Sequence, residues 1–117
     1  MATVPKKVKH FEKRQSLTLS CREWCKVHDL LYALLVSPKL GGLRKRRGPE
    51  NLERVKIAVE IIKSHTLDIA ELEQVTISDT YWVMSQIPWV INEAASYRIG
   101  ISSELVGNIY TQLQRKA

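Results

Sequence analysis

The sequence predicts an all-α fold, a compact single-domain bundle of four to six helices. Apolar residues recur at helical spacing in several segments, whereas no segment shows sustained period-two alternation and no Asn-Gly or Asp-Gly hairpin turn occurs. A length of 117 residues with 44% hydrophobic content suits one domain with its own core. We expect a basic, loosely ordered N-terminal arm over residues 1–15 and a helical bundle domain over residues 16–117.

The first helix is predicted over residues 20–36. Thr18 or Ser20 is the candidate N-cap, because a hydroxyl at that position can accept a bond from a free backbone N–H. The Ser37-Pro38 pair ends the helix, since the residue before a proline is pushed out of helical geometry. A broad apolar arc predicts a wide buried face, and it includes Trp24, Val27, Leu31 and Leu34.

A loop over residues 37–48 is expected to precede a second helix over residues 49–64, with Pro49 at its first position. The main apolar stripe of this helix consists of Leu52, Val55, Ala58, Val59 and Ile62. Ile57 and Ile61 project from nearly the opposite side, so the helix is either central in the bundle or open to a partner subunit. The sequence does not decide between these two alternatives. In the second one, Ile57 and Ile61 form the predicted partner interface of a possible homodimer.

The C-terminal half is predicted to be helical throughout. A short helix is expected over residues 67–74, followed by a strongly apolar segment over residues 78–98. Pro88 must kink or split that segment, because proline removes a hydrogen bond of the helix. Ser102 or the serine after it can cap a last helix that runs to about residue 115.

The positive charge is confined to the N-terminal part of the chain. Residues 1–48 hold 12 Lys/Arg against 3 Asp/Glu, whereas residues 49–117 hold 6 against 9. Such asymmetry within one domain predicts a polyanionic partner. We expect nucleic acid, RNA in preference to DNA, while an acidic protein or an acidic membrane surface remains an alternative that is less favoured.

The four consecutive cations Arg44–Arg47 are the main candidate site. They repel one another, a cost that phosphate binding would explain through charge-assisted bonds and counterion release. A nuclear import signal and an incidental solvated loop are the alternatives. The arm and the polar face of the first helix extend the expected contact surface, so the predicted nucleic-acid-binding residues are Lys6, Lys7, Lys9, Lys13, Arg14, Arg22, Lys26, Arg44, Lys45, Arg46 and Arg47.

The aromatic residues indicate the mode of binding. Trp24, Trp82 and Trp89 lie in apolar segments away from the basic runs, whereas base readers interleave aromatics with cations. The second helix begins with the acidic residues Glu50 and Glu53, which suits a major groove poorly. Backbone contacts with little base specificity are therefore expected.

Neither a metal, a cofactor nor an enzymatic activity is predicted. Cys21, Cys25 and His28 share one helix face and could bind zinc if His10 or His65 supplied a fourth ligand. The usual CxxC and HxxxH signatures are absent, however, and buried cysteines with a hydrogen-bonded histidine explain the same residues. No P-loop, GxSxG, HExxH or dinucleotide fingerprint occurs.

The expected location is cytoplasmic or nuclear. No apolar run approaches the roughly 20 residues of a membrane span, and the N-terminus lacks the apolar middle of a secretory signal. Two cysteines four positions apart do not readily form a disulfide within a helix, which favours a reducing compartment.

Overall fold

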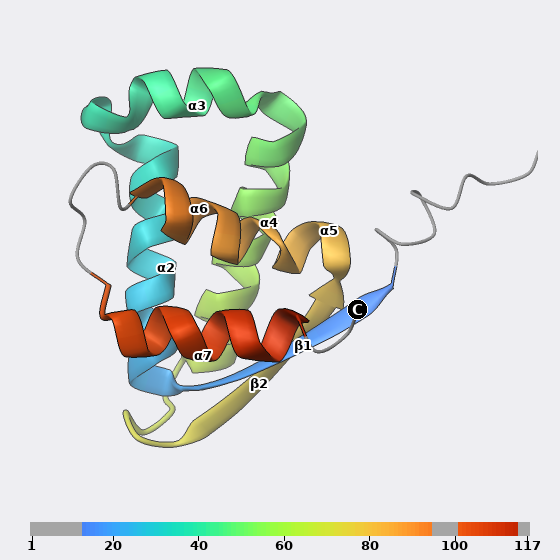
Figure 1. The fold of residues 1–117 in the computed structure, drawn as a ribbon. Helices are drawn as coiled ribbons and strands as arrows, with labels where there is room; N and C mark the ends of the chain where they lie inside the picture. Colours follow the sequence, from blue (N-terminus) through green and yellow to red (C-terminus); the bar gives the residue numbers. More distant parts are fainter. Residues whose placement is uncertain (1–12, 95–100, 115–117) are drawn as a thin grey trace, which may run out of the picture.

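The chain forms a mostly helical fold that also contains a two-stranded antiparallel sheet (Figure 1). The computed structural model describes residues 13–94 and 101–114. The prediction of an all-α bundle is therefore wrong, and the fold is mixed. In chain order the elements are β1 (Arg14–Ser20), α2 (Cys21–Val36), the 3₁₀ helix η1 (Pro38–Leu40), α3 (Gly41–Arg47), α4 (Pro49–Thr66), β2 (Gln74–Thr80), α5 (Tyr81–Met84), α6 (Gln86–Ala94) and α7 (Ser103–Gln114).

The two strands do show period-two alternation, but each is only seven residues long. Leu17 pairs with Ile77 on the buried face, and Thr18 pairs with Thr76 on the outer face, where their hydroxyls lie 2.7 Å apart. The partners are far apart in the sequence, so no hairpin turn marks the pair. Short alternation next to a basic segment is weak evidence by itself, which is why the sequence did not reveal the sheet.

Each strand runs directly into a helix through a hydroxyl cap. The Ser20 hydroxyl accepts a bond from the Glu23 N–H at 3.1 Å, and the Ser20 N–H donates to the Glu23 carboxylate at 2.9 Å. This capping box confirms Ser20 as the N-cap of the predicted first helix. Thr80 caps α5 by accepting from the Val83 N–H at 3.4 Å. The ends of the two strands therefore fix where α2 and α5 begin.

The predictions for two segments in the middle of the chain are wrong. Residues 37–48 do not form a loop but fold as η1 and α3, with Leu40 and Leu43 buried beneath them. Residues 67–73 form turns rather than a helix, and Gln74 already belongs to β2. The Thr66 hydroxyl donates back to the Ile62 carbonyl. The helix predicted over residues 49–64 is confirmed as α4, with Pro49 as its first residue.

The apolar segment predicted over residues 78–98 begins within β2, which ends at Thr80, and the helical part that follows is divided at Ser85 rather than at Pro88. Pro88 lies in the first turn of α6, where a missing backbone N–H costs little because such donors have no partner within the helix. The part of the predicted segment after Ala94 lies outside the described residues. The last predicted helix is confirmed as α7, with the Ser102 hydroxyl accepting from the Leu105 N–H at 3.2 Å.

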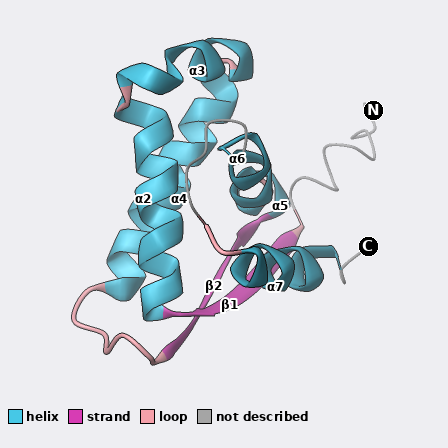
Figure 2. Ribbon diagram, turned by 60° about the vertical axis from the view of Figure 1, so that its left-hand side comes forward, coloured by secondary structure: helices cyan, strands magenta, loops and turns pink. Residues whose placement is uncertain are grey.

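The core lies between the antiparallel pair α2 and α4 on one side and α6, α7 and the sheet on the other (Figure 2). Trp24 is fully buried in it, and its indole N–H donates to the Val75 carbonyl at 2.8 Å, which ties α2 to β2. Other fully or nearly fully buried side chains come from every layer and include Leu17, Leu31, Leu34, Ile62, Ile77, Ile87 and Ile109.

Helix α7 covers the outer edge of β1 with a side-chain amide. The Thr18 N–H donates to Gln112 Oε1 at 2.7 Å, and Gln112 Nε2 donates to the Thr18 carbonyl at 2.8 Å. The amide thus replaces one residue of a third strand. An edge strand with open N–H and C=O groups invites pairing with other chains, so Gln112 both anchors α7 and blocks that edge.

We expect Gln112→Ala to lower the free energy of unfolding by about 1–3 kcal/mol, because two bonds to the Thr18 backbone are lost together. Urea denaturation followed by circular dichroism measures this change. Thr111→Ala is the matched control, since the exposed Thr111 hydroxyl bonds only within its own helix, to the Gly107 carbonyl. Equal stability of the two variants would contradict the proposed anchoring.

Candidate nucleic-acid interface

The basic run lies on a short helix that is fixed to the end of α2. Residues 38–48 contain five Lys/Arg and no carboxylate. Arg44 Nη1 donates to the Leu34 and Ser37 carbonyls, both at 2.7 Å. Carbonyls at a helix C-terminus lack partners within the helix and carry the negative end of its dipole. Arg44 therefore holds α3 against α2.

Arg47, the last residue of α3, fixes the C-terminal end of this helix to α6. Its Cζ atom lies 3.6 Å from the centroid of the Trp89 ring, and its Nη2 donates to Gln86 Oε1 at 3.1 Å. Gln86 is itself buried, and its Nε2 donates to Asn51 Oδ1 at 3.2 Å. Burial lowers the pKa of Arg47, an effect that the charge of Glu93 partly opposes. The guanidinium is thus a structural connection between α3, α4 and α6.

Lys45 and Arg46, between these two arginines, are exposed on α3, and Lys39 is exposed on η1. The predicted block of four phosphate-binding cations is thus divided in the fold. Arg44 and Arg47 make the contacts with α2 and α6 described above, and Lys45 and Arg46 are exposed. Phosphate contact by Lys45 and Arg46 stays a prediction.

The other predicted cations lie elsewhere on the surface. Lys13 and Arg14 are exposed at the start of β1, where Arg14 Nη2 donates to the Ser78 carbonyl at 2.8 Å. Arg22 and Lys26 are exposed on the first turns of α2. The remaining arm cations, Lys6, Lys7 and Lys9, are outside the described residues.

These cations form three separate groups rather than one continuous stripe. The seven residues of β1 separate the Arg14 end from the start of α2 by about 20 Å. The 16 residues of α2 separate Arg22 from α3 by a similar length, about 24 Å along the whole helix. Figure 1 shows the start of β1, the start of α2 and α3 at three corners of the fold.

Ile57 and Ile61, the predicted partner interface, are half-buried and pack against the core. Helix α4 contacts α2 on one side and α5, α6 and β2 on others. The second apolar side of α4 thus packs on the chain's own elements, which fits the alternative that the helix is central. Contact of these two residues with a partner stays a prediction.

Cys21, Cys25 and His28 differ in burial and in their contacts. Cys21 is buried, with its sulfur 3.7 Å from the Thr66 carbonyl oxygen and 3.6 Å from that of Ile69. Cys25 is at the surface, and His28 Nδ1 lies 3.2 Å from the Asp29 carboxylate. Among the residues that the structure describes, no cluster of three or more His, Cys, Asp or Glu could hold a metal ion.

Two arginine–tryptophan contacts escaped the sequence analysis. Arg47 stacks on Trp89, and Arg54 lies over the Trp82 ring with its Cζ 4.0 Å from the centroid. The tryptophans are distant from these arginines in the sequence but contact them in the fold. Arg47 ends α3 and Arg54 lies on α4, whereas Trp82 lies on α5 and Trp89 on α6, so each contact joins two helices. No local pattern in the sequence indicates either contact.

Comparisons with protein-family models, with curated proteins and with solved structures found no match for this chain. Its function is therefore inferred from its own side chains. No helix within residues 13–94 and 101–114 combines the length and apolar character needed to cross a bilayer.

Arg44→Ala should destabilise the protein by about 2–4 kcal/mol, because two charge-assisted bonds to the end of α2 are lost. Lys45→Ala, one position along the same helix, is the matched control and should change stability by less than about 0.5 kcal/mol. Chemical denaturation compares the two, and amide exchange should show faster opening of α3 only in Arg44→Ala. Equal effects of both substitutions would show that Arg44 is not a tether.

Cys25 should react slowly with iodoacetamide at neutral pH. Partial burial and the neighbouring Cys21 raise the pKa of Cys25, so less of it is the reactive thiolate than in an ordinary exposed thiol. The alkylation rate should keep rising above pH 9, the ordinary pKa of the group. Mass spectrometry of the labelled chain measures it, with unfolded protein as the reference. A rate at pH 7 above that of the unfolded chain would contradict this expectation.

Proposed function

We propose that the protein binds the phosphate backbone of nucleic acid, RNA in preference to DNA, through the end of the fold formed by η1 and α3. The observation that carries the proposal is that the cations of the basic run lie in two different environments. Arg44 and Arg47 fix α3 to the rest of the protein, and Lys39, Lys45 and Arg46 extend at the surface beside it. Cations on a fixed helix bind with less loss of side-chain and backbone freedom than cations on a loop.

The position of the other cations favours a polymer over a small phosphate ligand. Lys13 with Arg14, and Arg22 with Lys26, lie about 20 Å or more from α3 along β1 and α2. A single phosphate group cannot span such distances. A nucleic acid carries a phosphate at every nucleotide and can contact separate groups of cations along its length.

The surroundings of the tryptophans support backbone binding without base stacking. Trp24 is fully buried, and Arg47 and Arg54 lie over the rings of Trp89 and Trp82. Single-strand binders stack bases on open aromatic faces.

Lys45→Ala/Arg46→Ala should weaken binding to both duplex and single-stranded RNA. Each phosphate contact that is lost should reduce the slope of log affinity against log salt by about 0.7 on a single strand, and by about 0.9 on B-form DNA. Fluorescence anisotropy with labelled oligonucleotides at several salt concentrations measures affinity and slope together. Competition between RNA and DNA of the same sequence tests the preference for RNA.

Lys56→Ala/Lys63→Ala is the matched control, since it removes the same charge from exposed positions on α4. We expect this control to keep most of the salt slope. If both double variants lose the same slope, the protein attracts polyanions by net charge alone and α3 is not the contact site. An unchanged affinity in Lys45→Ala/Arg46→Ala would overturn the proposal directly.

A further inference from the structure

The most exposed large apolar side chains form two patches of different character. Among the described residues they are Tyr32 (51% exposed), Val36 (54%), Leu67 (69%) and Leu72 (77%). Tyr32 and Val36 lie on α2, and Leu67 and Leu72 lie in the turn between α4 and β2. An exposed apolar side chain is ordinary by itself, but two patches with opposite local charge suggest complementary surfaces.

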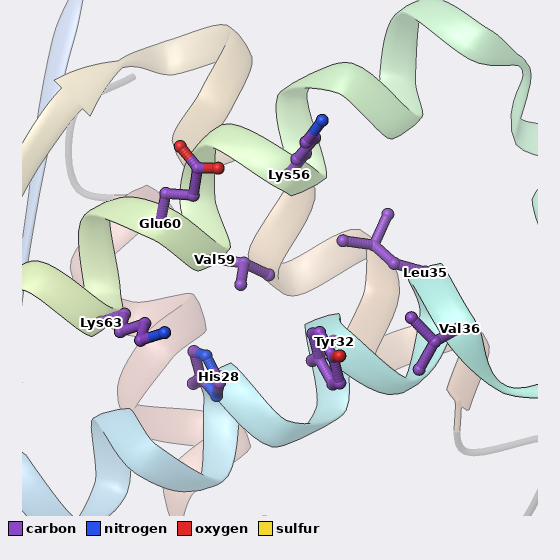
Figure 3. A pocket seen from close by; sticks show the side chains of 8 residues that line it. All are labelled: His28, Tyr32, Leu35, Val36, Lys56, Val59, Glu60 and Lys63. Atoms are coloured by element: carbon purple, nitrogen blue, oxygen red, sulfur yellow. The ribbon is translucent and has the colours of Figure 1, made fainter.

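The first patch is a groove of about 570 Å³ between α2 and α4. Its apolar lining includes Tyr32, Val36 and Val59, and Figure 3 shows Lys56 and Lys63 along its α4 side with Glu60 between them. Helices α6 and α7 pack on the opposite side of the α2–α4 pair (Figure 2). None of the described elements covers this groove, which we call the α2–α4 groove.

The second patch is the turn over residues 67–73, which we call the acidic turn. It contains Asp68, Glu71 and Glu73 but no Lys or Arg. Its backbone is ordered, because the Cys21 N–H donates to the Glu73 carbonyl and the Arg22 N–H to the Glu71 carbonyl, both at 2.9 Å. The exposed leucines are thus presented on a fixed support, which lowers the entropy lost when a partner binds them.

We propose that the acidic turn of one copy docks in the α2–α4 groove of a second copy. Leu67 and Leu72 would contact the apolar lining around Tyr32 and Val36, and Glu71 and Glu73 would lie near Lys56 and Lys63 at its edge. Burying the leucines at the centre with charge pairs at the rim matches the anatomy of protein interfaces.

The acidic turn cannot fill the groove of its own chain. It is bonded to the first two residues of α2, whereas the groove begins at His28 and extends to Val36. Those positions lie about 9 to 21 Å further along the helix. Movement of the turn into the groove would break its bonds to Cys21 and Arg22. The docked turn must therefore come from another molecule.

The proposed contact joins two different surfaces, so every added copy leaves one groove and one turn unoccupied. Such head-to-tail contacts close into rings or continue as filaments. This distinguishes the proposal from a symmetric dimer, in which the same surface would contact itself. The inference does not depend on nucleic-acid binding, because none of its residues belongs to η1 or α3.

Mixing two variants tests the head-to-tail contact. Tyr32→Glu places a carboxylate in the groove, and Leu72→Asp removes the apolar contact from the acidic turn and adds a carboxylate that an altered groove would repel. Sedimentation velocity on nuclease-treated protein should show concentration-dependent assembly of the wild type and a monomer for each variant alone. An equimolar mixture should form a dimer and nothing larger, since only one intact groove and one intact turn remain per pair.

Circular dichroism and thermal melting of each variant establish that it is folded before the mixture is interpreted. A wild type that stays monomeric at about 1 mM overturns the proposal. Assembly that Tyr32→Glu abolishes and Leu72→Asp leaves intact also overturns it, because that result would indicate a symmetric groove-to-groove dimer. Failure of the mixture to form a dimer from two folded, monomeric variants also overturns it. Nucleic-acid affinity of the same variants, measured at protein concentrations at which the wild type is monomeric, should equal that of the wild type, so the two proposals succeed or fail separately.

Discussion

The pairing of β1 with β2 is the constraint on which the other elements depend. Each strand ends in a hydroxyl residue, Ser20 or Thr80, that caps the next helix, so the sheet fixes the start of both α2 and α5. Trp24 then ties α2 back to β2 through its bond to the Val75 carbonyl. A slip of one residue in the register would turn Leu17 outward and displace both caps together. The small sheet therefore orients a fold in which most residues are helical.

In helix α3, two residues of a run of four cations stabilise the fold. A helix of seven residues is marginal alone, because nucleation costs more than so few bonds return. Its two terminal-turn arginines compensate by finding partners outside the helix, carbonyls of α2 for Arg44 and the ring of Trp89 for Arg47. Guanidinium groups suit both tasks, since they donate several bonds in a plane and stack on aromatic rings. The repulsion within the run is thereby offset by contacts with other elements.

The sequence predicted the elements that carry strong local signals. Helices α2, α4 and α7 were expected close to their observed bounds, because apolar periodicity and capping residues lie within each segment. The sheet was missed, since β1 and β2 depend on a partner that is distant along the chain. For the same reason α3 was taken for a loop: its stability comes from Leu40, Leu43 and two arginines packing on α2 and α6, which no local pattern describes.

The candidate site was likewise predicted only in part, because the sequence does not show which residues contact other elements in the fold. Counting charges identified the basic run and the N-terminal excess, but it could not distinguish Arg44 and Arg47 from Lys45 and Arg46. That distinction follows from helical geometry: positions 44 and 47 are one turn apart and face the protein, so 45 and 46 face outward. The Arg47–Trp89 contact also removes a tryptophan face from any base-stacking role. Arg47, which is half-buried, therefore covers one face of Trp89 while it holds α3 in place.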